Sequence, residues 1–216
     1  WENCYHHGIP STSDVRMPWR IYVFKKRGRD RAMPRFIMHT DRRELVMFRT
    51  FFPDEYLDST YVIDFEKLYA QGYRGLIFDI DNTLVPHGAP ADKRAKALFK
   101  RLKKIGFQCC LLSNNQYERV SSFNKDVQVH FIENAHKPSR KNYRRAMELM
   151  GTDLETTVFV GDQLFTDVYG AKRTGMHNIL VKPIHPKEEI QIVLKRKLEK
   201  IVLYFYRNDQ RKRKNS

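Results

Sequence analysis

A short apolar run ends on two aspartates, and this combination constrains the fold more than any other stretch of the chain. Residues 75–80 read GLIFDI, with Asp79 inside the run and Asp81 directly after it. The run is too short for a helix and is typical of a buried strand. Two carboxylates so close together repel each other and lose hydration, unless a cation or a proton lies between them. The sequence therefore predicts a strand that ends at a charge-neutralising site.

Strand-like and helix-like stretches alternate after this point, which predicts an α/β fold: a Rossmann-like parallel sheet with helices on both faces. Ser139 and Gly151 are the expected N-cap and C-cap of one of the helices. The stretch between the second and third strands reads as a polar segment. The expected strands are 75–80, 107–113, 129–132, 157–162 and 178–181, and the expected helices are 92–105, 139–151 and about 164–174.

Polar side chains fall at the ends of three of these strands. Asp79, Ser113 and Asp162 each stand where an apolar run stops. Ligands of such folds bind at the carboxyl ends of the strands, near the point where the strand order reverses. Together with Asp81 and Asp167, these residues would form an oxygen-rich site of the kind that suits Mg²⁺.

Four short motifs make the chain resemble the haloacid dehalogenase superfamily of phosphohydrolases. They occur in order as DIDNT at 79–83, LLSNN ending at Asn115, the lysine of HKP at 137, and GDQLFTD at 161–167. Longer stretches resemble the YqeG-type group of subfamily IIIA, which is related to phosphatidylglycerophosphate phosphatases. The resemblance extends over about residues 47–205, and Met47 matches the usual start of such proteins.

The resemblance implies a role for each matching residue. Asp79 would attack phosphorus and form an aspartyl phosphate. Asp81 would protonate the leaving oxygen and later accept a proton from water. Lys137 would offset the negative charge that develops.

Other matching residues would bind the phosphate or the metal. Phosphate contacts are implied for Ser113, for Asn114 through its backbone, and for Thr83, which would mainly fix the loop. Mg²⁺ would be held by Asp79, the carbonyl of Asp81 and the carboxylate of Asp162. Asp167 would orient these ligands without contacting the metal itself.

No cap domain fits between the motifs. The intervals from Asp79 to Ser113 and from Ser113 to Lys137 each have room for one helix and one strand or less. An uncovered site cannot enclose a small substrate by closing a lid. A substrate with its own bulk or surface is therefore expected, such as a protein, a nucleic acid or a lipid headgroup.

The basic charge of the chain lies mainly at its ends. The formal net charge is +15, and residues 1–46 and 187–216 each hold ten basic side chains against five and four acidic ones. This divides the chain into a basic extension (1–46) that is poorly ordered or foreign to the fold, a phosphatase domain (47–186), and a basic amphipathic helix with a tail (187–216). No stretch is apolar and long enough to span a bilayer, and no signal peptide is recognisable. The spacing of Cys4, Cys109 and Cys110 suits neither a disulfide nor a metal, so a reducing, cytoplasmic location is expected.

The last segment offers two interpretations. Its apolar stripe either packs against the sheet as the final helix or lies in a membrane interface, where its aromatic residues and the RKRK run at 211–214 suit an anionic leaflet. The stripe comprises Ile190, Leu194, Leu198, Ile201 and Phe205.

The leading hypothesis is a Mg²⁺-dependent phosphatase that converts phosphatidylglycerophosphate to phosphatidylglycerol, with peripheral contact to the inner face of an anionic membrane. One alternative keeps the chemistry on a soluble nucleotide or sugar phosphate or on a phosphoprotein. Another is an RNA- or ribosome-associated binding protein, which the intact motifs and the lack of an RNA-reading aromatic pattern do not favour. The oligomeric state stays open.

Overall fold

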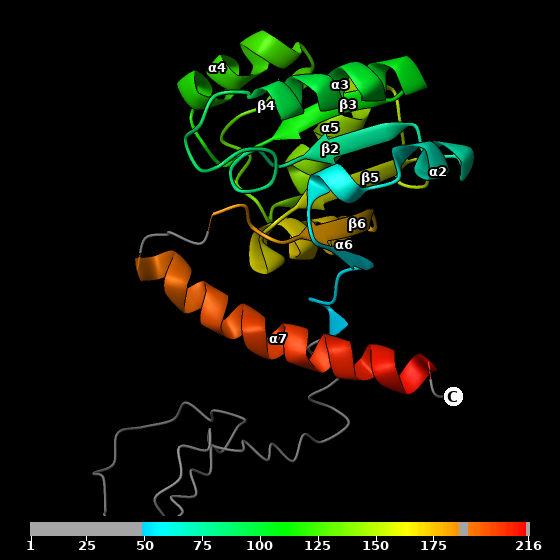
Figure 1. Cartoon of the computed structure of the whole chain (residues 1–216), viewed down its shortest axis with the longest axis vertical. Coiled ribbons are helices and arrows are strands. Elements are labelled where there is room, and N and C mark those ends of the chain that lie inside the picture. Colours follow the sequence, from blue (N-terminus) through cyan, green and yellow to red (C-terminus); the bar gives the residue numbers. More distant parts are fainter. Residues whose placement is uncertain (1–48, 186–189, 215–216) are drawn as a thin grey trace, which may run out of the picture. The chain divides into compact units, whose positions relative to one another are not determined.

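A parallel sheet forms the centre of the fold in the computed structural model, which describes residues 49–185 and 190–214 (Figure 1). The sheet has six strands in the order β1-β6-β5-β2-β3-β4, and every neighbouring pair is parallel. The strands are β1 (Glu55–Leu57), β2 (Gly75–Phe78), β3 (Gln108–Leu112), β4 (His130–Ile132), β5 (Thr157–Gly161) and β6 (His177–Val181).

Helices connect consecutive strands, as right-handed crossovers between parallel strands require. The helices are α2 (Phe65–Ala70), α3 (Lys93–Ile105), α4 (Tyr117–Val127), α5 (Arg140–Met150), α6 (Tyr169–Thr174) and α7 (Ile190–Lys214), with a short 3₁₀ turn η1 (Thr60–Val62) and a π-helix η2 (Leu164–Val168). The predicted Rossmann-like α/β fold with helices on both faces is therefore confirmed.

Alternation along the strands separates the core into two layers. Leu76 and Phe78 of β2 pack in one cluster with side chains of α2, α3 and α4, whereas Ile77 packs in another with side chains of α5 and α6. Cys109 and Cys110 are free, buried thiols that belong to opposite layers. A strand that is apolar at every position is what a sheet covered on both faces demands.

Two expected helix boundaries follow from local chemistry. Asp92 accepts a hydrogen bond from the amide of Ala95 and so begins α3, and Gly106 ends α3 with a φ of 112°, a left-handed conformation that suits glycine. Ser139 precedes α5 as expected, but its side chain makes no capping hydrogen bond. Gly151 ends α5 with a φ of 65°.

Several elements differ from the sequence-based expectation, and among them the turn η1 and the helix α2 were not expected. The polar segment after β3 contains the helix α4, whose buried side chains are Val120 and Phe123. The helix expected at about 164–174 begins as η2 and becomes α6 only at Tyr169. Strand β1, which pairs with β6 at the edge of the sheet, was not expected.

The connections leave no room for a cap. Between β2 and β3 the chain forms only α3, and between β3 and β4 only α4. The expected absence of a cap in these intervals is confirmed.

The C-terminal helix α7 packs against the core through a face that agrees with the expected stripe at Phe205 but not at Ile201. Val202 and Phe205 are buried in a cluster with Phe52 and with Leu164 of η2, but Ile201 is 42% exposed. The expected stripe is thus wrong at Ile201, because the true buried face is rotated toward Val202. The side chains of Ile190, Leu194 and Leu198 lie outside the described residues, as do residues 1–46 and their expected disorder. Among the helices that are described, none is both long and apolar enough to cross a membrane.

Candidate active site

Three neighbouring strands deliver their next residues to one edge of the sheet. β2 lies between β5 and β3, and it is followed by Asp79, as β5 is by Asp162 and β3 by Ser113. β2 is also the strand from which the chain first runs outward to β4 and then returns to β5 on the other side. The three residues therefore meet at the switch point of the sheet, where α/β folds bind ligands.

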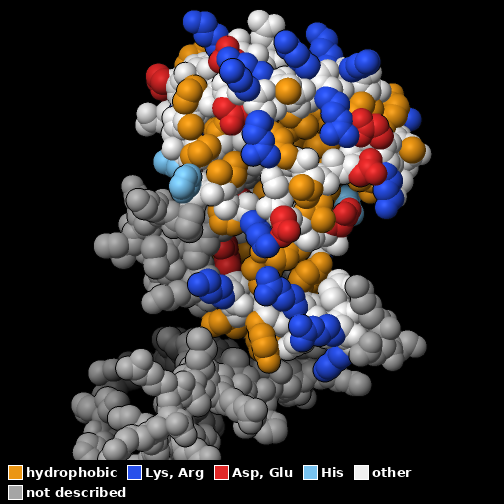
Figure 2. All heavy atoms as spheres, in the orientation of Figure 1, with side chains coloured by type: hydrophobic (Ala, Val, Ile, Leu, Met, Phe, Trp, Pro, Cys, Tyr) orange, Lys and Arg blue, Asp and Glu red, His pale blue; other side chains and the backbone are white. Residues whose placement is uncertain are grey.

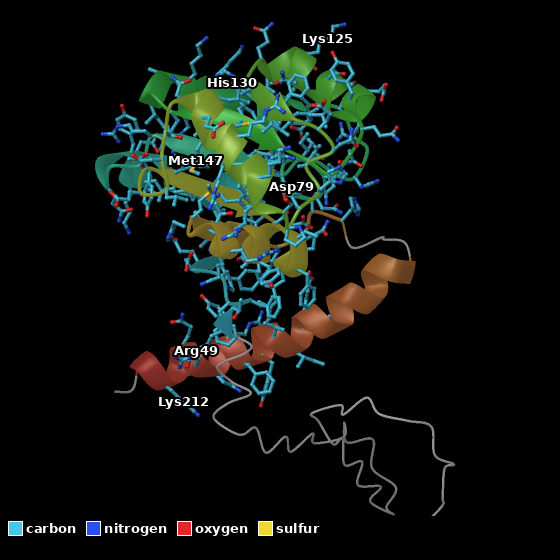
Figure 3. All side chains as sticks on the ribbon, turned by 180° about the vertical axis from the view of Figure 1, so that it is seen from behind. Arg49, Asp79, Lys125, His130, Met147 and Lys212 are labelled. Atoms are coloured by element: carbon cyan, nitrogen blue, oxygen red, sulfur yellow. The ribbon has the colours of Figure 1, made fainter. Side chains whose placement is uncertain are left out.

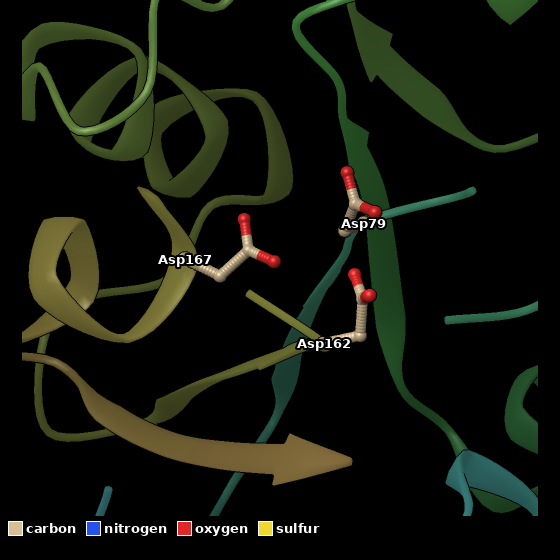
Figure 4. Close-up of side chains that lie close together, drawn as sticks. All are labelled: Asp79, Asp162 and Asp167. Atoms are coloured by element: carbon tan, nitrogen blue, oxygen red, sulfur yellow. The ribbon is translucent and has the colours of Figure 1, made fainter. Parts of the chain in front are cut away.

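A cluster of three buried carboxylates lies at this edge (Figure 4). Asp79, Asp162 and Asp167 each contribute one oxygen, and these oxygens lie within 4.8 Å of one another. All three side chains are buried. Since like charges out of water repel strongly, this cluster needs a cation nearby.

Lys137 supplies part of that positive charge. Its Nζ donates hydrogen bonds to Oδ1 of Asp79 at 2.6 Å and to Oδ1 of Asp167 at 2.7 Å. The lysine comes from the loop between β4 and α5, and Asn114 holds that loop by accepting a hydrogen bond from the Lys137 amide at 2.7 Å. The nucleophile candidate and the lysine are thus joined directly.

For Asp79 and for Lys137, burial and the neighbouring opposite charge shift the pKa in opposite directions. Burial raises the pKa of Asp79 to about 6; the Lys137 ammonium opposes this rise, and the carboxylates of Asp167 and Asp81 add to it. For Lys137, burial disfavours the charged form, but the attraction of Asp167 and Asp79 outweighs it and raises the pKa. Lys137 is therefore a firmly charged ammonium at neutral pH.

Asp167 reaches the cluster because of two local features. The π-helix η2 carries it, and its Oδ2 accepts a hydrogen bond from the Gln163 amide at 3.0 Å. A Cβ atom at Gly161 would overlap with this carboxylate, so only glycine fits at the end of β5. The sequence suggested that Asp167 acts from behind the metal, and the structure gives it an oxygen in the cluster and hydrogen bonds at both oxygens.

The carboxylate of Asp81 faces a different set of partners. Asn82 adopts a left-handed φ of 63°, which asparagine tolerates, and turns the chain just after Asp81. Oδ1 of Asp81 accepts hydrogen bonds from the Gly88 amide at 2.7 Å and from Nη2 of Arg119 at 2.9 Å, and Oδ2 accepts one from Asn115 at 2.6 Å. The two aspartates of the opening motif thus lie close in sequence but have separate hydrogen-bond partners.

The remaining candidates line the same edge. Thr83 is buried, and its hydroxyl contacts Asp162 at 3.3 Å and Asp79 at 3.5 Å. The Ser113 hydroxyl accepts a hydrogen bond from the Asn115 amide at 3.2 Å. All of the expected site residues therefore gather at one edge of the sheet, and the carboxylate of Asp81 is the one that stands outside the acidic cluster.

Arg119 and Glu199 belong to this region and were not identified from the sequence. Arg119 contacts Asp81 from α4, and Oε1 of the buried Glu199 accepts a hydrogen bond from the Leu164 amide, two residues after Asp162, at 2.9 Å. A reliable prediction of α4 would have identified Arg119 as a candidate, since it lies in the first turn of that helix. No local sequence pattern indicates the role of Glu199.

The donor set fits a hard divalent cation. Among the described residues, one ammonium contacts these three buried carboxylates, which all offer oxygen, so the negative charge of the described cluster is in excess. Mg²⁺ prefers oxygen ligands, takes one or two carboxylates and keeps several waters. Asp79 and Asp162 would hold such an ion, while Asp167 is already engaged by Lys137 and the Gln163 amide.

Comparisons with known proteins point to one family. A HAD-hydrolase-like family model matches residues 134–189. The chain is 37% identical over 159 residues to a probable phosphatase YqeG of Bacillus subtilis, an alignment that covers 73% of this chain and 92% of the relative. It is 27% identical to the chloroplastic and mitochondrial phosphatidylglycerophosphate phosphatase 1 of Arabidopsis thaliana, covering 65% of this chain and 44% of that protein. It is also 27% identical to a glyceraldehyde 3-phosphate phosphatase of Pyrococcus abyssi, over 41% of each chain.

Proposed function

The chain belongs to the YqeG-type phosphatases of the haloacid dehalogenase superfamily and is a phosphoric monoester hydrolase, and from this premise we propose that it is Mg²⁺-dependent and acts on phosphatidylglycerophosphate. The product would be phosphatidylglycerol. The observation that carries the catalytic part of the proposal is the contact of Asp79 with Lys137 inside a cluster of buried carboxylates.

Asp79 is the proposed nucleophile. Its carboxylate attacks phosphorus, the ester oxygen leaves, and an aspartyl phosphate forms on Asp79. Lys137, at 2.6 Å from Asp79, keeps this carboxylate ionised and stabilises charge on the phosphoryl oxygens. Mg²⁺, when bound, would neutralise the substrate phosphate and the acidic cluster.

Asp81 is the proposed acid and base. It gives a proton to the leaving oxygen and then accepts one from the water that hydrolyses the aspartyl phosphate. The amide of Gly88 and the side chain of Asn115 orient its carboxylate on either side. Ser113 and the backbone at Asn114 would contact the transferred phosphoryl group.

An uncovered site supports a substrate that lies in a surface. In the described part of the chain no cap is present between β2 and β4, so no closure of a cap in these intervals would exclude water from the site. A lipid headgroup presented by a bilayer brings its own surface to such a site. Two relatives named as phosphatidylglycerophosphate phosphatases favour this lipid.

A basic groove beside the site supports contact with an anionic membrane. It has a volume of about 800 Å³, and Pro138, the residue after Lys137, is one of the residues that line it. Within the described ranges, none of its basic side chains takes part in a salt bridge. These side chains are Arg140, Lys141, Arg144 and Arg145 of α5 and Arg173 of α6. Lys and Arg side chains are also spread over the face of the molecule seen in Figure 2. Each basic residue near an anionic surface contributes about 1 kcal/mol to binding.

A phosphate-release assay tests the proposal. The purified protein would be incubated with phosphatidylglycerophosphate in vesicles and with sugar and nucleotide monoesters, with Mg²⁺ and with a chelator. We expect Mg²⁺-dependent release that is fastest on the lipid, and its loss in Asp79→Asn. Asp58→Asn, which changes an exposed aspartate outside the site, is the control and should keep full activity. Faster release from a soluble monoester would identify that monoester, and not the lipid, as the preferred substrate. Undiminished activity of Asp79→Asn would exclude the covalent mechanism.

A further inference from the structure

Arg119 places a guanidinium at the rim of the site, on the side of Asp81. It lies in the first turn of α4, and its side chain is 18% exposed. Its Nη2 donates to Oδ1 of Asp81 at 2.9 Å, and its Cζ lies 5.8 Å from the ring centre of Phe123. The ring and the carboxylate together fix the position of the guanidinium.

The hydrogen bonding of Asp81 does not depend on this arginine. The Gly88 amide already donates to Oδ1, and the Asn115 side chain donates to Oδ2. A guanidinium carries five N–H groups, and Nε of Arg119 is buried with no hydrogen-bond partner in the described part of the chain. A buried donor without an acceptor is unfavourable and needs explanation. Arg119 thus has donor capacity beyond what Asp81 uses.

The position of Arg119 decides which part of a substrate it could meet. Asp79, Lys137 and the acidic cluster lie at the phosphoryl end of the proposed reaction. Asp81 is the group proposed to protonate the leaving oxygen, so Arg119, which contacts Asp81, would lie beside the leaving alcohol. His87, 68% exposed and with Nδ1 3.9 Å from the same Asp81 oxygen, flanks it on the open side.

We propose that Arg119 is a specificity-determining residue that binds a second anionic group carried by the leaving alcohol. This inference rests on the proposed phosphatase function and adds which group of the substrate is recognised, namely the second anionic group. A phosphodiester joined to the leaving oxygen through a glycerol bridge has the right chemistry, because guanidinium groups bind phosphate oxygens with charge-assisted, often bidentate hydrogen bonds. The anionic group could belong to a lipid headgroup or to a soluble bisphosphate.

Three substrates with one glycerol bridge test this directly. Dihexanoyl phosphatidylglycerophosphate carries a phosphodiester on the leaving alcohol, glycerol 1,3-bisphosphate carries a free phosphate there, and glycerol 3-phosphate carries no second charge. We expect Arg119→Gln to lower kcat/KM for the first two by on the order of ten- to a hundredfold more than for the third, with most of the difference in KM. Arg119→Lys should recover only part of the preference, because an ammonium cannot make the bidentate contact.

A basic residue on the same helix provides the control. Lys125 is exposed near the other end of α4, away from Asp79 (Figure 3), and Lys125→Gln should leave the preference unchanged. Equal loss on all three substrates in Arg119→Gln would overturn the inference and leave Arg119 as a residue that only positions Asp81. If Arg119→Gln lowered kcat/KM by the expected factor for the lipid alone, the anion that Arg119 recognises would be the phosphodiester of a headgroup. If the wild-type protein released phosphate from no monoester, the proposed function itself would fail, and the inference with it.

Discussion

At the scale of single residues, the site separates two aspartates that the sequence places together. The left-handed turn at Asn82 lets Asp79 bond with Lys137 while Asp81 bonds with Asn115 and Arg119. Each carboxylate therefore has its own cationic partner. Like-charge repulsion is reduced by this division before any metal binds, and the two groups can take different chemical roles.

Removing the charge of Lys137 should destabilise the protein unless metal is present. Lys137→Ala leaves Asp79 and Asp167 buried without their ammonium, and breaking a buried pair in this way typically costs about 3–5 kcal/mol. We expect a lower midpoint of urea unfolding in the presence of a chelator. Because Mg²⁺ no longer competes with the lysine, Mg²⁺ should raise the melting temperature of the variant more than that of the wild type.

An exposed lysine serves as the control for this measurement. Lys96 pairs with Asp126 at the surface, and Lys96→Ala should change stability little with or without Mg²⁺. A Lys137→Ala variant as stable as the wild type under chelation would mean that the buried carboxylates take up protons at little cost, and the charge argument would fail.

The catalytic candidates at the ends of strands could be predicted from the sequence because their positions depend on local patterns alone. An apolar run followed by a polar residue locates Asp79, Ser113 and Asp162 on one edge as soon as the sheet is known to be parallel. The contacts of Arg119 depend on how α4 packs, and those of Glu199 on how α7 docks. Tertiary packing of this kind leaves no periodic signal in the sequence.

At the scale of elements, α7 is linked to the acidic site as well as to the core. Val202 and Phe205 pack with Leu164 and Val168 of η2, the same element that carries Asp167. Glu199 adds a hydrogen bond to the Leu164 amide at the start of η2. The helix α7, for which the sequence left a core and a membrane role open, thus supports the segment between Asp162 and Asp167, which includes the start of η2.

Loss of this hydrogen bond should weaken metal binding. Glu199→Ala leaves the Leu164 amide without its acceptor, which typically costs about 1–3 kcal/mol of stability. We expect the Mg²⁺ dissociation constant from calorimetry to rise several-fold, since the loop is less well fixed, whereas Glu199→Gln, which keeps an acceptor oxygen, should stay near the wild type.

The neighbouring residue on α7 separates this effect from a general change in the helix. Lys200 is exposed, and Lys200→Ala should leave the Mg²⁺ affinity unaltered. If Glu199→Ala bound Mg²⁺ as tightly as the wild type, α7 would be a packing element with no influence on the site.

Elements were predictable where one local pattern dominates and were missed where the local pattern is weak or absent. The apolar face of α3 and the glycine that ends it, Gly106, made that helix recognisable. The helix α4 buries only Val120 and Phe123 along a polar sequence, so its periodicity is weak. Strand β1 is half-buried along its three residues and gains its place from pairing with β6, which no local signal encodes.

At the scale of the whole molecule, basic charge and the open site lie next to each other. The groove is lined by Pro138, the residue after Lys137, and by basic side chains of α5, the helix that follows the loop carrying this lysine. The basic residues at the C-terminal end, which suit an anionic leaflet, are therefore accompanied by basic residues within the domain, in the groove along α5.

Reversing charge in this groove should reduce binding to anionic vesicles. The double change Arg144→Glu and Arg145→Glu alters exposed side chains that face away from the buried side of α5, so the fold should persist. In vesicle sedimentation we expect a loss on the order of tenfold or more, decreasing with added salt, and unchanged turnover of a soluble monoester. Lys93→Glu with Lys103→Glu on α3 applies the same change of net charge elsewhere, and an equal loss in that control would assign binding to overall charge.

The lack of a cap between β2 and β4, in the part of the chain that the structure describes, also has a kinetic consequence for the proposed reaction on a lipid. In an enzyme with a lid, opening and closing of the lid take up part of each catalytic cycle. In this protein, turnover on the proposed lipid would depend instead on lateral diffusion of the next headgroup into the site. Thinning the phosphorylated lipid with an inert one, at constant total amount, should then slow the reaction in proportion, because the relevant concentration is counted per area of bilayer and not per volume of solution.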